Sequence, residues 1–235
     1  MASCIICGAN GRMGRTLVRA VCASSAWRCA ACVDPAFAAA QGTGSAPRFS
    51  SLSLLPGAGV RADVVIDFSC AQALAALAQY CLQTNTPCVL CATGYSPAQQ
   101  RQIEALAQCV PVFQSANLSY GAAVLTRLVR EATRLLDGGY DVAVTEAHHR
   151  GKKDAPSGTA KTLIRAIGRS DVPVCAVRAG TIIGEHQVLF AGQDETLTLA
   201  HHAQSRSIFA QGALRAAQFV KDQEPGIYHM EDLVS

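Results

Sequence analysis

Membrane-spanning runs, strong charge and aromatic residues are scarce or absent in this sequence of 235 residues. No apolar run approaches the length of a membrane span, and the net charge of +3 is too small to indicate nucleic acid or a membrane surface as a partner. The N-terminus, MASCIICGANGR, lacks a basic segment ahead of its apolar residues, which argues against a secretion signal. We therefore expect a globular, cytoplasmic protein with no nucleic-acid or membrane partner.

Cysteine, in contrast, is common, with 11 residues. Without a secretion signal, we expect reduced thiols that pack as small apolar side chains. Three pairs have the CxxC spacing of zinc and redox motifs, namely Cys4 with Cys7, Cys29 with Cys32 and Cys88 with Cys91. All three pairs lie in apolar runs typical of strands, where residues i and i+3 point to opposite faces of the sheet. We therefore predict no metal site.

The first half of the chain alternates short apolar runs with helical patterns. This rhythm is typical of a parallel sheet that is covered by helices on both faces. The expected strands cover residues 3–7, 29–33, 63–68, 87–92 and 110–114, and the expected helices cover residues 13–24, 71–83 and 97–108. The pattern predicts a nucleotide-binding type of α/β domain.

After residue 120 the pattern changes. We expect a long helix over residues 121–136, a strand over 141–146, a helix that starts at Ser157 and a last helix over 208–220. Four apolar runs, at residues 174–179, 181–184, 187–191 and 195–200, follow one another without a helix between them. We expect these runs to form antiparallel strands.

A glycine-rich turn, GANGRMG, follows the first expected strand and opens the first helix. Glycine at positions 8, 11 and 14 allows a tight turn, close approach of the backbone to a pyrophosphate and close packing of helix on strand. Asp34 lies 20 residues after Gly14, where an acidic residue can bind a ribose diol. No lysine or arginine stands beside Asp34, which favours NADH as the cofactor and leaves NADPH possible. The alternative is a glycine turn that only packs a helix on a strand.

The stretch EAHHRGKKDAPSGTAKTL, residues 146–163, concentrates positive charge in a weakly charged chain. It can be a solvated basic loop, because most charge runs are. A metal site on His148 and His149 is disfavoured, because adjacent residues of a strand point to opposite faces. A phosphate or nucleic-acid patch is disfavoured, because the stretch lacks interleaved aromatic residues and wider basic charge around it.

A further interpretation uses the whole stretch. Ser157, Gly158 and Thr159 open a helix, so backbone N–H groups there can bind an anion the size of a carboxylate. Lys152 and a nearby histidine would add cationic donors. A small dicarboxylate would be held at both ends, and a histidine with a pKa of about 6.5 can transfer a proton at neutral pH.

At this point the chain resembles a known family, 4-hydroxy-tetrahydrodipicolinate reductase, also called dihydrodipicolinate reductase. The stretch from residue 146 to residue 160 looks like the family's signature. Further matching segments occur in family order at residues 8–14, 65–69, 92–94, 116–119, 178–180, 183–186 and 205–210. The resemblance covers nearly the whole chain.

The resemblance implies an oxidoreductase of diaminopimelate and lysine biosynthesis. It would reduce 4-hydroxy-tetrahydrodipicolinate to tetrahydrodipicolinate with hydride from NADH or NADPH. His148 and Lys152 would be catalytic. His148 would be the proton donor or acceptor, and Lys152 would be the second proton donor and would bind a substrate carboxylate. The residues implied to bind the substrate are His149, Ser157, Gly158 and Thr159. The residues implied to bind the cofactor are Gly8, Ala9, Asn10, Gly11, Arg12, Met13, Asp34, Cys91, Ala92, Thr93, Ser115, Ala116, Asn117 and Leu118.

The expected fold class is α/β, with a Rossmann-like parallel-sheet nucleotide domain and a smaller α+β substrate domain that has an open mixed sheet. Residues 1–118 and 206–235 would form the dinucleotide-binding domain. Residues 119–205 would form the substrate-binding and oligomerisation domain. The family usually forms tetramers, so we expect a homo-oligomer.

Two features depart from the family's pattern. A glycine- and arginine-containing segment is missing just before Arg178, near the usual subunit contacts. Cys91 and Ala92 also replace the first two residues of the family's Gly-Thr-Thr-Gly motif. Two other functions stay open, namely a dehydrogenase of a different small acid and an NADH-binding sensor that has lost catalysis.

Overall fold

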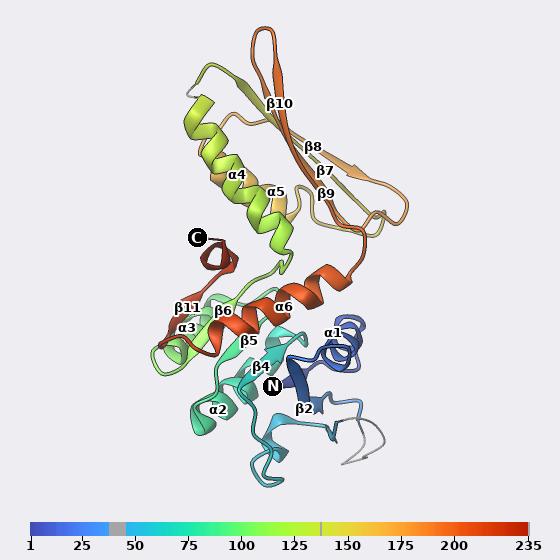
Figure 1. Ribbon diagram of the computed structural model, residues 1–235, viewed down its shortest axis with the longest axis vertical. Helices are drawn as coiled ribbons and strands as arrows, with labels where there is room; N and C mark the ends of the chain where they lie inside the picture. The colour runs from blue at the N-terminus through green and yellow to red at the C-terminus, as the bar shows by residue number, and fades with distance from the viewer. Residues whose placement is uncertain (38–45, 137, 235) are drawn as a thin grey trace. The chain divides into compact units, whose positions relative to one another are not determined.

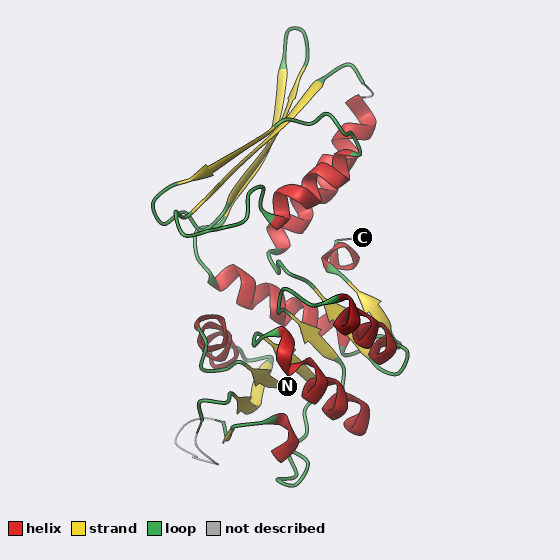
Figure 2. Ribbon diagram, turned by 180° about the vertical axis from the view of Figure 1, so that it is seen from behind, coloured by secondary structure: helices red, strands yellow, loops and turns green. Residues whose placement is uncertain are grey.

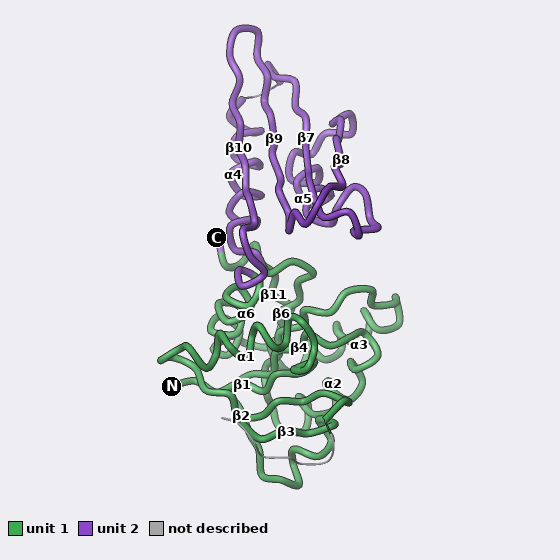
Figure 3. Tube along the Cα trace, turned by 90° about the vertical axis from the view of Figure 1, so that its right-hand side faces the viewer, with its two compact units in different colours: residues 1–118, 209–233 green, residues 119–208, 234–235 purple. Residues whose placement is uncertain are grey.

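The computed structural model describes residues 1–37, 46–136 and 138–234. The chain divides into two compact units, one of residues 1–118 with 209–233 and one of residues 119–208 with 234–235 (Figure 3). Each unit has its own sheet, so each is described by itself. Among the described residues, no helix has both the length and the apolar character that crossing a membrane requires.

The first unit is built on a seven-stranded parallel sheet in the order β11-β6-β5-β4-β1-β2-β3 (Figure 1). The strands are β1 (Ala2–Cys7), β2 (Trp27–Val33), β3 (Arg48–Phe49), β4 (Val64–Asp67), β5 (Cys88–Leu90), β6 (Pro111–Gln114) and β11 (Gly226–Tyr228). The central strands are buried along almost their whole length and consist mainly of apolar residues, because helices cover both faces of the sheet (Figure 2). The predicted Rossmann-like sheet is confirmed.

The helices of this unit begin and end near the predicted boundaries. They are α1 (Arg12–Cys22), α2 (Leu74–Thr84), α3 (Pro97–Ala107) and α6 (Ser207–Val220), with 3-10 turns at Ala71–Ala73, Leu52–Leu54 and Met230–Leu233. Helix α3 starts as the sequence suggests. The Ser96 hydroxyl accepts a hydrogen bond from the backbone N–H of Gln99, Gln99 bonds back to Ser96, and Pro97 follows the cap.

Strand β2 contains a bulge that corrects one of our predictions. Cys4 pairs with Cys29, but the next residue, Ile5, pairs with Ala31, so β2 contains one extra residue. The extra residue shifts the alternation of the side chains, and the sulfur atoms of Cys29 and Cys32 lie 3.6 Å apart. The prediction that these two thiols point to opposite faces is therefore wrong.

Among the described residues, no group of three or more histidine, cysteine, aspartate or glutamate side chains could hold a metal.

The sequence pattern did not predict β3 and β11. The first has two residues and the second has three, too few for an alternating pattern to stand out. Both are edge strands that form because a neighbour offers unpaired backbone groups, β2 in one case and β6 in the other.

The second unit is a four-stranded mixed sheet in the order β10-β9-β7-β8, with two helices on one of its faces (Figure 1). The strands are β7 (Asp141–His148), β8 (Val174–Arg178), β9 (Glu185–Ala191) and β10 (Thr196–His202), and the helices are α4 (Tyr120–Leu136) and α5 (Gly158–Ile167). Every second residue of β7 is buried towards the helices. The core between sheet and helices contains Val129, Val144, Leu163, Val188 and Phe190. The predicted open mixed sheet is confirmed.

Three details of this sheet differ from the predictions. Strand β8 pairs in parallel with β7 and does not lie beside β9, because α5 connects β7 to β8 as a crossover. Residues 181–184, predicted as a strand, form a turn and an irregular connection between β8 and β9. Strand β7 extends two residues beyond its predicted end and includes His148.

Candidate functional site

The predicted cofactor residues gather at one edge of the parallel sheet. The glycine turn follows β1, Asp34 follows β2, Cys91 follows β5 and Ser115 follows β6. Because all these strands are parallel, their carboxyl ends meet at the same edge. The strand order changes direction between β1 and β4, and this is where nucleotides bind in open α/β sheets.

The glycine turn leaves no room for side chains. Gly8 has a φ of +71°, and a Cβ atom there would lie 2.7 Å from the carbonyl oxygen of Phe68. A Cβ on Gly14 would lie 2.0 Å from the carbonyl oxygen of Gly8. Helix α1 then begins after Gly11, which provides no side-chain cap, and no acidic residue lies in its first turn at residues 12–15. The N-terminus of α1 can therefore receive an anion.

Asp34 is held in place at the end of β2. One of its carboxylate oxygens accepts a hydrogen bond from the backbone N–H of Asn10 at 3.0 Å, and the other accepts one from the N–H of Ala36 at 3.0 Å. The carboxylate thus joins the glycine turn to the second strand. Its position suits recognition of a ribose beside a pyrophosphate.

The predicted cofactor residues of the glycine turn and of the segment after β5 differ in exposure. Within the glycine turn, Ala9 is buried, whereas Asn10 and Arg12 are exposed and Met13 is half-buried. After β5, Ala92 is buried, Cys91 is half-buried and Thr93 is exposed.

After β6, the backbone N–H of Ser115 donates to the carbonyl oxygen of Leu90 at 3.0 Å, and its hydroxyl donates to the carbonyl oxygen of Asn117 at 2.8 Å. Ala116 is exposed and Leu118 is buried. The segment is therefore anchored to the neighbouring strand by a backbone hydrogen bond at Ser115.

A buried carboxylate, Asp67, lies at the end of β4 beside these segments. One of its oxygens accepts hydrogen bonds from the backbone N–H and the hydroxyl of Ser69, while its other oxygen has no protein partner among the described residues. Burial raises the pKa of Asp67 and also that of the Cys91 thiol. The negative charge of Asp67 raises the pKa of Cys91 further. Cys91 is therefore a protonated thiol at neutral pH and acts as a small packing group.

In the second unit, one buried carboxylate organises the basic stretch. Glu146 is only 2% exposed, and hydrogen bonds reach both of its oxygens. Oε1 accepts from the backbone N–H of Ser157 at 3.0 Å and from Nη2 of Arg178 at 2.7 Å. Oε2 lies 2.5 Å from Nδ1 of His148 and accepts from Nη1 of Arg178 at 2.9 Å. These bonds hold the pKa of Glu146 below its usual value although burial opposes them.

His148 lies on the buried face of β7, and its side chain is 10% exposed. Desolvation lowers the pKa of its imidazole, the carboxylate of Glu146 raises it, and Lys152 and Arg178 lower it. Lys152 forms an ion pair of 2.8 Å with Asp154 and is partly exposed. Exposed pairs of this kind contribute about 1 kcal/mol or less, so an anionic ligand can compete for the ammonium group.

The helix-opening residues have different roles. The hydroxyl of Ser157 caps α5 by accepting from the N–H of Ala160 at 3.2 Å, and it lies 3.1 Å from Nε2 of His186. The backbone N–H of Ser157 is also bonded, to Glu146. Gly158 is exposed and Thr159 is half-buried, both in a first turn that contains no acidic residue. The first turn of α5 is thus suited to an anion at Gly158 and Thr159.

The site contains three residues to which we assigned no role from the sequence. Glu146 could have been found, because it precedes His148 by two residues and so shares its face of the strand. Arg178 lies opposite His148 in the register of β7 and β8, which no sequence pattern reveals. His186 packs edge-on against His148, with ring centroids 5.1 Å apart, and burial lowers its pKa to about 4.

His149, in contrast, is half-buried and follows the end of β7, where its carbonyl oxygen accepts from the backbone N–H of Lys152 at 3.0 Å. It is therefore the first residue of the turn that carries Lys152.

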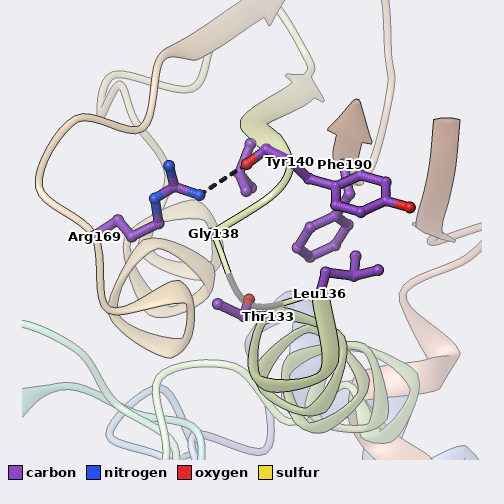
Figure 4. A pocket seen from close by; sticks show the side chains of 7 residues that line it. Thr133, Leu136, Gly138, Tyr140, Arg169 and Phe190 are labelled. Carbon is purple, nitrogen blue, oxygen red and sulfur yellow. Dashed lines mark hydrogen bonds between the residues drawn. The ribbon is translucent and has the colours of Figure 1, made fainter. Parts of the chain in front are cut away.

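A cavity of about 310 Å³ lies elsewhere in the second unit. Figure 4 shows its lining, which includes Leu136, Tyr140, Arg169 and Phe190. Arg169 donates a hydrogen bond of 2.9 Å to the carbonyl oxygen of Tyr140 across its rim. None of the predicted site residues lines this cavity, so its size does not identify the site.

Two family models match the chain, namely "Dihydrodipicolinate reductase, N-terminus" over residues 2–118 and "Dihydrodipicolinate reductase, C-terminus" over residues 121–234. The chain is similar to 4-hydroxy-tetrahydrodipicolinate reductase of Caldanaerobacter subterraneus, at 38% identity over 256 residues that cover 100% of this chain and 98% of that protein. The protein of the same name from Methanoregula boonei is 40% identical over 254 residues, with the same coverage.

The fold is also similar to that of a solved structure, the dipicolinate-bound dihydrodipicolinate reductase of Paenisporosarcina sp. TG-14. The TM-score is 0.82 and the identity 25%, over 99% of both chains. The alignments with the curated relatives are longer than the 235 residues of this chain, so those relatives contain residues with no counterpart here.

Proposed function

Because the chain belongs to the dihydrodipicolinate reductase family, we propose that it has the activity for which the family is named. The reaction is the reduction of 4-hydroxy-tetrahydrodipicolinate to tetrahydrodipicolinate by NADH or NADPH, in diaminopimelate and lysine biosynthesis. The observation that carries the proposal is the cluster around Glu146. It presents His148, Lys152 and the open first turn of α5 in one unit of the chain.

The first unit is the proposed nucleotide-binding domain, and its residues fit a dinucleotide. The turn at Gly8 and Gly14 has no space for a Cβ atom, which is the construction that lets a pyrophosphate approach the backbone. Asn10, Gly11, Arg12 and Met13 would contact the pyrophosphate and adenosine, as the family resemblance implies.

Other segments of the same edge of the sheet would complete the cofactor site. The segments after β5 and β6, at residues 91–93 and 115–118, would line the nicotinamide. When bound, the cofactor supplies a hydride to the substrate.

NADH is the proposed preferred cofactor. Asp34 carries a negative charge where the 2′-substituent of the adenosine ribose would lie, and Pro35 and Ala36 follow it. A ribose hydroxyl can donate to this carboxylate, whereas a 2′-phosphate would be repelled by it. NADPH would therefore be used with lower efficiency.

The second unit is the proposed substrate domain. One substrate carboxylate would bind at Gly158 and Thr159, where backbone N–H groups of α5 and the helix dipole favour an anion. The ammonium group of Lys152, released from Asp154, would bind a carboxylate and provide a proton. His149 would contact the same ligand from the start of the turn. Ser157 would act through its cap of α5, because its own N–H is bonded to Glu146.

His148 is the proposed proton donor to the substrate. Reduction of an unsaturated ring by hydride leaves electron density on a neighbouring atom, and a nearby acid must then supply a proton. The Nδ1 atom of His148 faces Glu146, so Nε2 is the nitrogen that can exchange a proton with a ligand.

A homo-oligomer is proposed from the outer face of the four-stranded sheet. This face, opposite the helices, consists mainly of small and uncharged residues such as Ala143, Thr145 and Ala147. Val177 lies opposite Ala147 on β8 and is 44% exposed. Such a surface is suited to association, and a tetramer is usual in the family.

The eleven free cysteines support a location in a reducing compartment such as the cytoplasm.

The proposed activity can be tested by following nicotinamide absorbance. The substrate is generated in place from pyruvate and aspartate semialdehyde by a purified synthase, and NADH and NADPH are compared side by side. The proposal predicts rapid oxidation that depends on this protein, faster with NADH. No oxidation of either cofactor by folded protein that binds NADH would overturn it and favour the sensor.

A further inference from the structure

We propose that Glu146 is a positioning residue of the reductase, which fixes the orientation and the tautomer of His148 and holds the N-terminus of α5 beside it. This inference deepens the proposed function and rests on it for the role of His148. It assigns to one side chain the task of joining the proton donor to the anion-binding turn.

The contacts of Glu146 connect three segments of the second unit. Its carboxylate lies on β7, two residues before His148, and binds the imidazole of that residue at 2.5 Å. It also accepts from the backbone N–H of Ser157, the residue that caps α5. Arg178, from β8, reaches both oxygens with two nitrogens, at 2.9 Å and 2.7 Å. All four bonds therefore converge on one carboxylate.

Burial of an ionised carboxylate is unfavourable unless hydrogen bonds and an opposite charge compensate for the lost hydration. An ionised carboxylate that is 2% exposed loses nearly all of its hydration. Arg178 compensates for this loss with its positive charge and a bidentate interaction with the carboxylate. It also donates a hydrogen bond to the carbonyl oxygen of Asp154. A packed apolar side chain would avoid this cost, but it could not accept hydrogen bonds from Nδ1 of His148 and the backbone N–H of Ser157.

The bond to Glu146 determines which nitrogen of His148 is available. A carboxylate can only accept, so Nδ1 carries a proton and Nε2 becomes the nitrogen that changes protonation. Gly184 is the residue next to Nε2, because a Cβ atom at that position would lie 3.1 Å from it. Glycine thus keeps Nε2 uncrowded on the side away from Glu146.

Charged and titratable groups lie around His148 on its own strand, on β8 and β9 and on the turn after β7. Glu146 lies on its own strand, Arg178 on β8, His186 on β9, and Lys152 and Asp154 on the turn after β7. Among these groups, Glu146 is the anion in direct contact with the imidazole. Without its charge, Arg178 and Lys152 would act on His148 with less opposition, and protonation of the imidazole would become harder.

The variant Glu146→Gln tests the inference, because the amide retains the shape of the carboxylate and removes its charge. We expect kcat to fall by about 10- to 100-fold, with a smaller change in KM and no change in NADH affinity. The pH above which kcat declines should also move to lower values, because the protonated form of His148 would be lost earlier as pH rises. Glu195→Gln, the same exchange at the far end of the sheet, serves as the matched control and should leave kcat, KM, NADH affinity and the pH profile unchanged.

Two further measurements keep the inference testable if Glu146→Gln folds poorly or if the wild type lacks turnover. Gly184→Ala places a methyl group beside Nε2 and should lower kcat while the protein remains folded. Nitrogen NMR of the imidazole reports the tautomer of His148 without any substrate, so it separates this inference from the proposed activity. A wild-type His148 protonated only at Nε2, or a folded Glu146→Gln enzyme with wild-type kcat and pH profile, would overturn it.

Discussion

The two proposed sites would bind anions by different means. In the proposed nucleotide unit, the binding surface would be backbone, because Gly8 and Gly11 before α1 and Gly14 in its first turn carry no side chains. In the proposed substrate unit, the surface would depend on charged side chains, which the buried carboxylate of Glu146 aligns through its hydrogen bonds.

This difference predicts different responses to mutation. A backbone site tolerates changes of charge around it and fails when a side chain fills it. A site built from buried charges tolerates small changes of volume at its rim and fails when one partner of the network is removed.

The largest effect is expected for His148→Gln in the substrate unit. Loss of the proton donor should lower kcat by roughly 10² to 10⁴, while NADH affinity stays within about twofold of the wild type. The control is His202→Gln, at an exposed position on the opposite face of the same sheet. Steady-state kinetics and fluorescence titration of NADH measure the two quantities. Equal kcat values for His148→Gln and the wild type would remove His148 from the mechanism.

A filled backbone turn should have the next largest effect. In Gly14→Ala, the new Cβ would lie 2.0 Å from the carbonyl oxygen of Gly8, so the turn must shift. We expect NADH affinity to fall by about tenfold or more and stability to fall by about 1 to 3 kcal/mol. Gly57→Ala is a matched control, because the nearest atom to its Cβ would be 3.9 Å away. Normal NADH binding by Gly14→Ala would contradict a backbone-built site.

The pH dependence of stability should differ between the wild type and His186→Gln. Burial lowers the pKa of His186 from 6.5 to about 4, so the unfolded chain takes up a proton in this range and the folded chain does not. Wild-type stability should therefore fall by roughly 1 to 3 kcal/mol more than that of the variant between pH 6.5 and pH 4. Urea unfolding at several pH values measures the difference, and parallel curves for both proteins would show that His186 titrates normally.

The smallest effect is expected for Asp34→Asn in the nucleotide unit. The amide can still accept one of the two backbone hydrogen bonds, but it no longer repels a 2′-phosphate. The preference for NADH over NADPH, expressed as the ratio of kcat/KM values, should fall by about tenfold or less. A ratio unaffected by the exchange would mean that Asp34 does not select the cofactor.

The nucleotide unit was predictable because its signals are local. An apolar strand, a glycine turn, a helix and an acid follow one another within 34 residues, and their order alone implies a parallel sheet. In this unit, the sequence could not reveal features that depend on pairing between neighbouring strands. The bulge that brings Cys29 beside Cys32 depends on the register with β1, and β11 forms only because β6 has a free edge.

In the substrate unit, the sequence motif was predictable, whereas the hydrogen-bond network around Glu146 was less so. His148, Lys152 and Ser157 stand in one short stretch, so their joint appearance suggested a site. Arg178 and His186 come from β8 and β9, and only the strand pairing brings them to Glu146 and His148. The parallel pairing of β8 was missed because the crossover through α5 was not recognised as one.

Calorimetric titration of 2,6-pyridinedicarboxylate, an analogue of the product, into NADH-saturated protein tests the proposed substrate site directly. We predict one site per chain in the wild type and an affinity at least about tenfold lower in Lys152→Ala. We also predict wild-type affinity in Lys221→Ala, which changes a similarly exposed, ion-paired lysine of the other unit. Equal binding by the wild type and Lys152→Ala, or no binding by the folded wild type, would contradict the claim that the cluster around Glu146 holds a small dicarboxylate.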